Sequence, residues 1–251
     1  MPDLALLRAQ LRNQMRALEG LPSLTAGAGA ASAPLGVAAI DDCLPWGGLP
    51  LGGLHEIRPE RSAAPGAALG FAACLLGRVA RERRGKLLWL TLSDQLYPAG
   101  LAGLGVPTER LLVVRPTRMA DLLWAAEEGL RCKGVAGVLA ELEGADFKSA
   151  RRLSLAARGS GVPALLFNQK ENLGAVLTRW QVGPAASEAS VGLGPWRWRI
   201  ALARCRGLAT SEADQALKWV VEAKHAKGGF SLVALSGDRS SEEDARGRRA
   251  G

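Results

Sequence analysis

The chain has little of the chemistry on which metal sites and covalent cross-links depend. Its 251 residues include two histidines and four cysteines, and no two cysteines form a C-x-x-C pair. Cys43, Cys74, Cys132 and Cys205 are therefore expected to be buried or idle thiols. Neither a disulfide framework nor a zinc site is predicted, and we expect no metal or other cofactor.

Long apolar runs are also missing. None approaches the ~20 residues that a membrane-spanning helix needs. The first residues carry arginines in a helical pattern, without the apolar stretch of a signal peptide. We expect a cytoplasmic protein that does not enter a membrane. With 251 residues, 48% of them hydrophobic, a single α/β domain with appendages is the natural expectation.

A third absence concerns phosphate chemistry. The glycine-rich stretch Gly47–Glu60 contains a short apolar strand that ends near Ile57. A loop and a helix-forming run come next, which is the strand, loop and helix order of a P-loop. A working P-loop needs glycines, a lysine for the β and γ phosphates, and a Ser or Thr for magnesium. The loop found here is Arg58, Pro59, Glu60, Arg61, Ser62, Ala63, Ala64 and Pro65. Ala64 stands in the lysine position and Pro65 in the hydroxyl position, so ATP hydrolysis is not expected. Weak anion binding by the arginines at a helix N-terminus stays open.

Positive charge is concentrated in one segment. Residues 148–206 contain ten basic and two acidic residues, which accounts for the whole net charge of +8. Such a segment favours a polyanion or an acidic protein as partner. An arginine-rich composition without any nucleic-acid contact is the alternative. The residues predicted to bind a partner or DNA are Lys170, Arg179, Arg197, Arg199, Arg204 and Arg206.

The chain divides into four parts by composition. Residues 1–19 predict an amphipathic helix whose apolar stripe, Leu4, Leu7, Leu11 and Leu18, would contact the core or another subunit. Residues 20–33 predict a linker rich in Gly, Ala, Ser and Pro, 34–235 the folded core, and 236–251 a disordered tail.

Within the core, short apolar runs alternate with helical ones. Strands are predicted at 54–57, 87–92, 111–114, 135–141 and 164–167, and helices at 67–83, 98–104, 119–131 and 146–158. This alternation indicates a mainly parallel sheet with helices on both faces. Three further runs, 196–203, 218–223 and 230–235, predict antiparallel strands that extend the sheet. In the first of them, Trp196, Trp198, Ile200 and Leu202 should face the core, with Arg197 and Arg199 on the other side.

Several short sequence motifs resemble those of RecA. They are Pro34-Leu-Gly-Val37, the glycine-rich approach to the loop, the Pro59-Glu60 pair, and the strand that ends in Asn168-Gln169. The resemblance implies a RecA-like three-layer sandwich. It also places Glu141 where RecA proteins carry the Walker B aspartate, and Asn168 and Gln169 where they carry phosphate-sensing residues. In this chain we interpret Glu141 as a relic or a surface carboxylate, and the Asn-Gln pair as satisfying backbone groups at a strand end.

A closer resemblance, from end to end, is to the ImuA family of RecA-like accessory proteins in SOS mutagenesis. The motifs that match this family are Gly47–Ile57, which includes Leu54-His-Glu-Ile57, then Asn168-Gln169, Trp180-x-Val182, Trp196–Arg199 and Trp219. The resemblance implies a non-catalytic adaptor in translesion synthesis. Its implied partners are an ImuB-like inactive Y-family polymerase, the error-prone C-family DNA polymerase and, as a further candidate, RecA.

Two other functions stay open. A nonspecific DNA-binding module would use the basic 148–206 segment, although the loop 170–179, which corresponds to a DNA loop of RecA, lacks an aromatic side chain for stacking. A cell-division inhibitor of the SulA type follows only from a label sometimes given to the family, and no residue points to it. Self-association through the N-terminal helix is a further possibility.

Overall fold

The computed structural model describes residues 31–61, 64–170, 173–187, 194–208, 217–224 and 229–235. The predicted N-terminal helix with its four leucines, most of the predicted linker, loop residues Ser62 and Ala63, and the predicted tail all lie outside these ranges.

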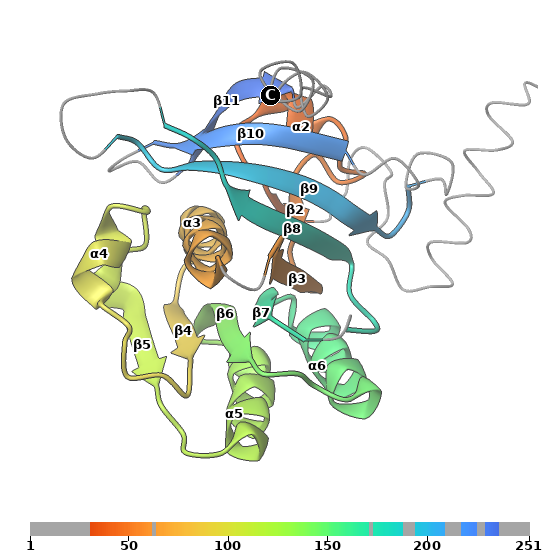
Figure 1. Ribbon diagram of the computed structural model, residues 1–251. Helices are drawn as coiled ribbons and strands as arrows, with labels where there is room; N and C mark the ends of the chain where they lie inside the picture. Colours follow the sequence, from red (N-terminus) through yellow and green to blue (C-terminus); the bar gives the residue numbers. More distant parts are fainter. Residues whose placement is uncertain are drawn as a thin grey trace, which may run out of the picture.

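One mixed sheet organises the described residues, with nine strands in the order β11-β10-β9-β8-β3-β7-β6-β4-β5 (Figure 1). The parallel strands are β3 (Leu54–Pro59), β4 (Lys86–Leu90), β5 (Leu111–Val114), β6 (Val135–Leu142), β7 (Ala164–Asn168) and β8 (Thr178–Pro184). The sheet continues antiparallel through β9 (Arg197–Cys205), β10 (Leu217–Ala223) and β11 (Phe230–Leu235). The predicted mainly parallel α/β sheet with an antiparallel extension is confirmed.

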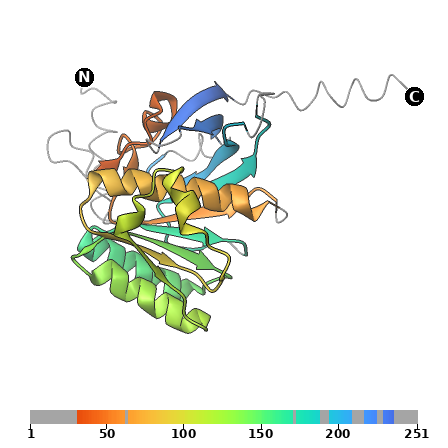
Figure 2. The ribbon, with the colours of Figure 1, turned by 90° about the vertical axis from the view of Figure 1, so that its left-hand side faces the viewer.

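Three longer helices cover the two faces of the sheet. These are α3 (Pro65–Glu82), α5 (Met119–Arg131) and α6 (Phe147–Ser160). Helix α3 contacts β3, β6, β7 and β8 on one face, while α5 and α6 pack against each other and against the opposite face. Figure 2 shows the sheet between α3 above and the pair α5 and α6 below.

Local sequence explains where these helices begin and end. Pro65 starts α3, where a residue without an N–H costs no helical hydrogen bond. Asp146 caps α6 by accepting a hydrogen bond from the Ser149 N–H at 2.7 Å, and Gly161 ends it in the left-handed conformation, at φ 74°. Shorter elements complete the chain: β1 (Ser32–Ala33), α2 (Ala38–Asp41), β2 (Leu49–Pro50), α4 (Pro98–Ala102) and the 3-10 turn η1 (Thr108–Arg110).

The antiparallel strands curve over α3 and enclose an aromatic cluster. The Phe71 ring on α3 lies with its centroid 5.9 Å from Trp180, 6.2 Å from Trp198 and 5.2 Å from Phe230. Trp219 joins the cluster at 6.4 Å from Trp180. Helix α3 therefore packs against both the parallel and the antiparallel parts of the sheet in one hydrophobic core.

Three details differ from the sequence-based expectations. Strand β8 was not predicted, because it contains Gly183 and Pro184, residue types that are depleted in strands. Trp198, Ile200 and Leu202 face the core as predicted, but the prediction for Trp196 is wrong. Trp196 precedes the start of β9 and is 42% exposed. The last two residues of the predicted linker form β1, which pairs with β2.

Among the described residues, no helix is both long and apolar enough to cross a bilayer. The same residues contain no group of three or more His, Cys, Asp or Glu side chains that could hold a metal ion.

We predict that Phe71→Ala lowers the free energy of unfolding by about 3–5 kcal/mol, because a fully buried ring shared by three strands leaves a cavity. Phe147→Ala is the matched control, since that ring is 65% exposed, and it should cost under about 1 kcal/mol. Urea denaturation of both variants measures the difference. Equal losses would contradict the placement of Phe71 at the centre of the core.

Candidate functional site

The carboxyl ends of three neighbouring parallel strands meet at one edge of the sheet. Strand β3 lies beside β7, with Ile57 opposite Phe167, and β7 lies beside β6, with Asn168 opposite Leu142. The loop that begins at Arg58, the Glu141 carboxylate and the Asn168-Gln169 pair are thereby brought together. This edge is where α/β sheets of this type bind ligands.

The loop after β3 has few groups to offer a phosphate. Ala64, immediately before α3, makes no side-chain cap, and Pro65 has no N–H to donate. The Arg58 guanidinium donates to the Lys170 backbone carbonyl, and Glu60 pairs with Arg199 at 3.0 Å. Arg61 is exposed. The described loop residues therefore lack both the lysine and the hydroxyl that would hold a nucleotide and its magnesium ion.

Glu141 is half-buried and already has a protein partner. It accepts a hydrogen bond from the Trp89 indole N–H of the adjacent strand β4 at 2.6 Å. Burial raises the pKa of Glu141, while hydrogen bonds from Trp89 and Thr91 act in the opposite direction. Since Trp89 is fully buried, this carboxylate satisfies an indole donor that would otherwise have no acceptor.

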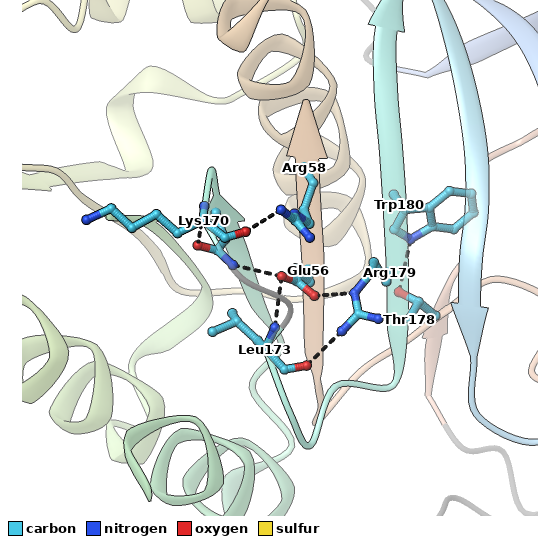
Figure 3. A network of polar contacts seen from close by, with 8 residues as sticks. Glu56, Arg58, Lys170, Leu173, Thr178, Arg179 and Trp180 are labelled. Atoms are coloured by element: carbon cyan, nitrogen blue, oxygen red, sulfur yellow. Dashed lines mark hydrogen bonds and ion pairs between the residues drawn. The ribbon is translucent and has the colours of Figure 1, made fainter. Parts of the chain in front are cut away.

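A second carboxylate, Glu56, lies in the middle of β3 and is completely buried. One of its oxygens accepts hydrogen bonds from the Asn168 side-chain amide at 2.8 Å and from the Leu173 N–H at 3.1 Å. The other accepts from Arg179 Nε at 2.5 Å, and Arg179 also donates to the Leu173 carbonyl at 2.8 Å. Figure 3 shows Glu56 between Leu173 and Arg179. This network joins β3, β8 and the connection that follows β7.

The connection after β7 is consequently packed against the protein. Leu173, Val176 and Leu177 are buried, and the Lys170 N–H donates to the Asn168 side chain at 3.3 Å. The Asn168 side chain therefore forms hydrogen bonds with Glu56 and with the Lys170 backbone, whereas the Gln169 side chain is exposed.

His55 belongs to a buried chain of hydrogen bonds on the opposite side of β3 from Glu56. The Trp180 indole N–H donates to Thr178 Oγ1 at 2.9 Å, and Thr178 lies 2.9 Å from His55 Nδ1. His55 Nε2 lies 2.9 Å from the Pro50 carbonyl, which can only accept, so Nε2 carries the proton and Nδ1 accepts from Thr178. Burial lowers the pKa of His55 to about 4, and the imidazole is neutral at physiological pH.

The predicted partner- or DNA-binding residues are not equivalent in the structure. Arg179 is 12% and Arg197 11% exposed, and each is held in an ion pair, Arg179 with Glu56 and Arg197 with Glu222 at 2.7 Å. Arg199 shares its charge with Glu60 on the surface. Lys170 and Arg204 are exposed and Arg206 is half-buried. These residues form no single uniform basic face.

Sequence reasoning missed Glu56, Trp89 and Thr178. The available signal for Glu56 was a lone acidic residue inside an otherwise apolar strand, which requires a buried partner. The partner, Arg179, is 123 positions away, and only the parallel pairing of β3 with β8 brings the two together.

The chain is similar to known proteins over most of its length. It is 34% identical over 239 residues to Protein ImuA of Caulobacter vibrioides, both in strain NA1000 / CB15N and in strain ATCC 19089 / CIP 103742 / CB 15. The match covers 86% of this chain and 94% of each relative. No protein-family model matches the chain. Among solved structures, SulA from Pseudomonas aeruginosa superposes with a TM-score of 0.41 at 24% identity, covering 47% of this chain and 98% of that one.

We predict that the Glu56–Arg179 pair is strongly coupled. Glu56→Gln and Arg179→Met should each lower the free energy of unfolding by about 3–5 kcal/mol. Each substitution removes one member of the ion pair and leaves the other member's buried charge without its partner. The double variant should lose no more than the worse single variant. Arg199→Met, in a pair whose side chains are 48% and 43% exposed, is the control and should cost under about 1 kcal/mol. Additive losses in urea denaturation would contradict the coupling.

His55 makes stability depend on pH. Its folded pKa is about 4 against an ordinary value of 6.5, so the unfolded chain binds the extra proton between these values. The contribution of His55 is complete above pH 6.5 and is lost as the pH falls towards 4, by about 3 kcal/mol in all.

The test compares the free energy of unfolding at pH 7 and pH 4.5 in the parent chain, in His55→Gln and in His225→Gln, which removes the other histidine. Only His55→Gln should flatten the profile. An unchanged profile in His55→Gln would show that the buried imidazole is not the titrating group.

Proposed function

Because this chain belongs to the ImuA family, we propose that it is a non-catalytic RecA-like adaptor in bacterial SOS-induced, error-prone translesion DNA synthesis. Its proposed partners are an ImuB-like inactive Y-family polymerase, the error-prone C-family DNA polymerase and RecA. The similarity over 94% of the length of the ImuA relatives carries the assignment to this system.

The order of the strands supports a RecA-like fold. Strand β3, which precedes the P-loop-like turn, lies at the centre of the sheet beside β7. Glu141 and the Asn168-Gln169 pair stand at the carboxyl ends of β6 and β7, next to that turn. These are the places where a RecA-like ATPase carries its magnesium-ordering and phosphate-sensing residues.

The non-catalytic part draws on what those residues contact. Glu141 is engaged with Trp89, Arg58 with the Lys170 carbonyl, and Asn168 with Glu56. Ala64 and Pro65 occupy the lysine and hydroxyl positions of the loop. These residues do not fit a magnesium nucleotide, and their contacts stabilise the scaffold instead. An adaptor needs such a rigid scaffold, whereas an ATPase needs free ligands for phosphate and metal.

The same contacts favour an adaptor over the DNA-binding module. Arg179 and Arg197 are committed to ion pairs, and the connection 173–177 is packed inward with Leu173 and Val176 buried. A RecA-type DNA loop at this place would need exposed cations and an aromatic side chain for stacking.

The adaptor function is tested by co-purification. The tagged full-length chain is expected to retain an ImuB-like protein or RecA from cells treated with a DNA-damaging agent. The matched control is the same chain carrying Phe71→Ala, whose core is disrupted. Recovery of neither partner with the parent chain would contradict the adaptor function.

We predict that the purified chain neither hydrolyses ATP nor binds magnesium-ATP, since Ala64 and Pro65 stand where a P-loop has its lysine and hydroxyl residues. Isothermal titration and a phosphate-release assay, with purified RecA as the positive control, measure both properties. Turnover that disappears in Glu141→Gln would identify a remodelled ATPase site and overturn the non-catalytic assignment.

A further inference from the structure

The exposed faces of α5 and α6 carry an unusual combination of charge and apolar surface. On α6, Lys148, Arg151, Leu155 and Arg158 are all exposed and recur at intervals of three or four residues, so they form one stripe along the helix. The helix itself contains no acidic residue. We name these four residues, together with Trp124 of α5, the α5–α6 face.

The acidic groups of α5 are held in ion pairs, whereas the exposed Asp146, which caps α6, lies two residues before Lys148. Glu127, whose side chain is 6% exposed, pairs with Arg131 at 2.5 Å and also with Arg152 of α6. Asp121 pairs with Arg118 at 2.8 Å and Glu128 with Arg131 at 3.4 Å. Arg151 and Arg158 form no ion pair among the described residues. The α6 side of the face is therefore positive, whereas the α5 side is close to neutral.

Between the two helices lies a groove of about 230 Å³. Its apolar lining consists of Ala120, Leu123, Trp124 and Leu153, and its polar lining of Glu127, Ser149 and Arg152. Trp124 is 63% exposed at its rim, and Leu155 is 57% exposed on the adjacent turn of α6. Large apolar side chains exposed beside a groove are typical of interaction sites.

We propose that the α5–α6 face binds an acidic amphipathic helix of a partner protein. The apolar stripe of that helix would lie on Trp124 and fill the groove with a leucine- or phenylalanine-sized side chain. Its carboxylates, spaced three or four residues apart, would face Lys148, Arg151 and Arg158. The inference rests on the proposed adaptor function, for which it names one docking surface.

The chemistry of the face favours a peptide over nucleic acid. A single-stranded nucleic acid needs a continuous track of cations with several aromatic rings for stacking. This face has one exposed tryptophan and a mainly apolar groove, and its cations lie on α6 alone. Positive charge on one side of an apolar groove matches a helix with one acidic face and one apolar face.

The test uses a fluorescently labelled 18-residue peptide with Glu on one helical face and Leu on the other, a scrambled peptide of the same composition, and a single-stranded oligonucleotide of equal charge. The full-length chain should bind the amphipathic peptide at least tenfold more tightly than the scrambled one. Fluorescence anisotropy at two salt concentrations measures the affinities.

Two variants and one matched control locate the site. Lys148→Glu/Arg151→Glu and Trp124→Ala should each weaken peptide binding at least tenfold. The first variant places negative charge in the opening turns of α6, where the helix dipole favours it, so it should fold. Lys218→Glu/Arg84→Glu changes the net charge equally at exposed positions elsewhere and should alter affinity less than threefold. Circular dichroism and thermal melting check that all three are folded.

Equal binding of the two peptides, or equal affinity in all variants, would overturn the docking surface. Tight oligonucleotide binding that is lost in Lys148→Glu/Arg151→Glu, without peptide binding, would assign the face to nucleic acid and likewise overturn it. If an ImuB-like protein still co-purifies in either case, the adaptor function stands and only the surface is wrong. If the peptide binds as expected but no partner co-purifies, the adaptor function fails while the surface stands.

Discussion

Burial of the Glu56 carboxylate in the central strand is the constraint on which the rest of the carboxyl edge depends. A charge without access to water must be matched by an opposite charge and by hydrogen-bond donors. Arg179, the Asn168 amide and the Leu173 N–H supply them. To do so, β8 must pair with β3, and the connection after β7 must fold inward. One carboxylate thus holds together three segments that are remote in the sequence.

Other polar groups at this edge are likewise engaged by the protein itself. At the positions where a nucleotide-binding protein keeps polar groups free, Glu141 accepts from Trp89, Arg58 donates to Lys170 and Asn168 donates to Glu56. On the far face of the sheet, α5 and α6 enclose a mainly apolar groove beside the exposed cations of α6.

Sequence reasoning located most elements because their patterns are local. The strand at Leu111–Val114 and the helix at Met119–Arg131 coincide with their predicted bounds, and α6 is delimited by a cap and a left-handed glycine that can be read directly from the chain. Strand β8 was missed because Gly183 and Pro184 interrupt its alternating pattern. The inward position expected of Trp196 failed because β9 begins one residue later, and a strand's alternation constrains only residues inside it.

The sequence by itself determined the α/β class, the family, and the presence of Ala64 and Pro65 at the start of α3, because each can be read from residue patterns along the chain. Only the tertiary structure decided which charges remain available. Arg179 and Arg204 look alike in the sequence, yet one is committed to a buried carboxylate and the other faces solvent. The physical reason is that a charge is neutralised by whatever the fold brings within a few ångströms of it. Those neighbours come from sheet pairing across more than a hundred residues, which no local pattern records.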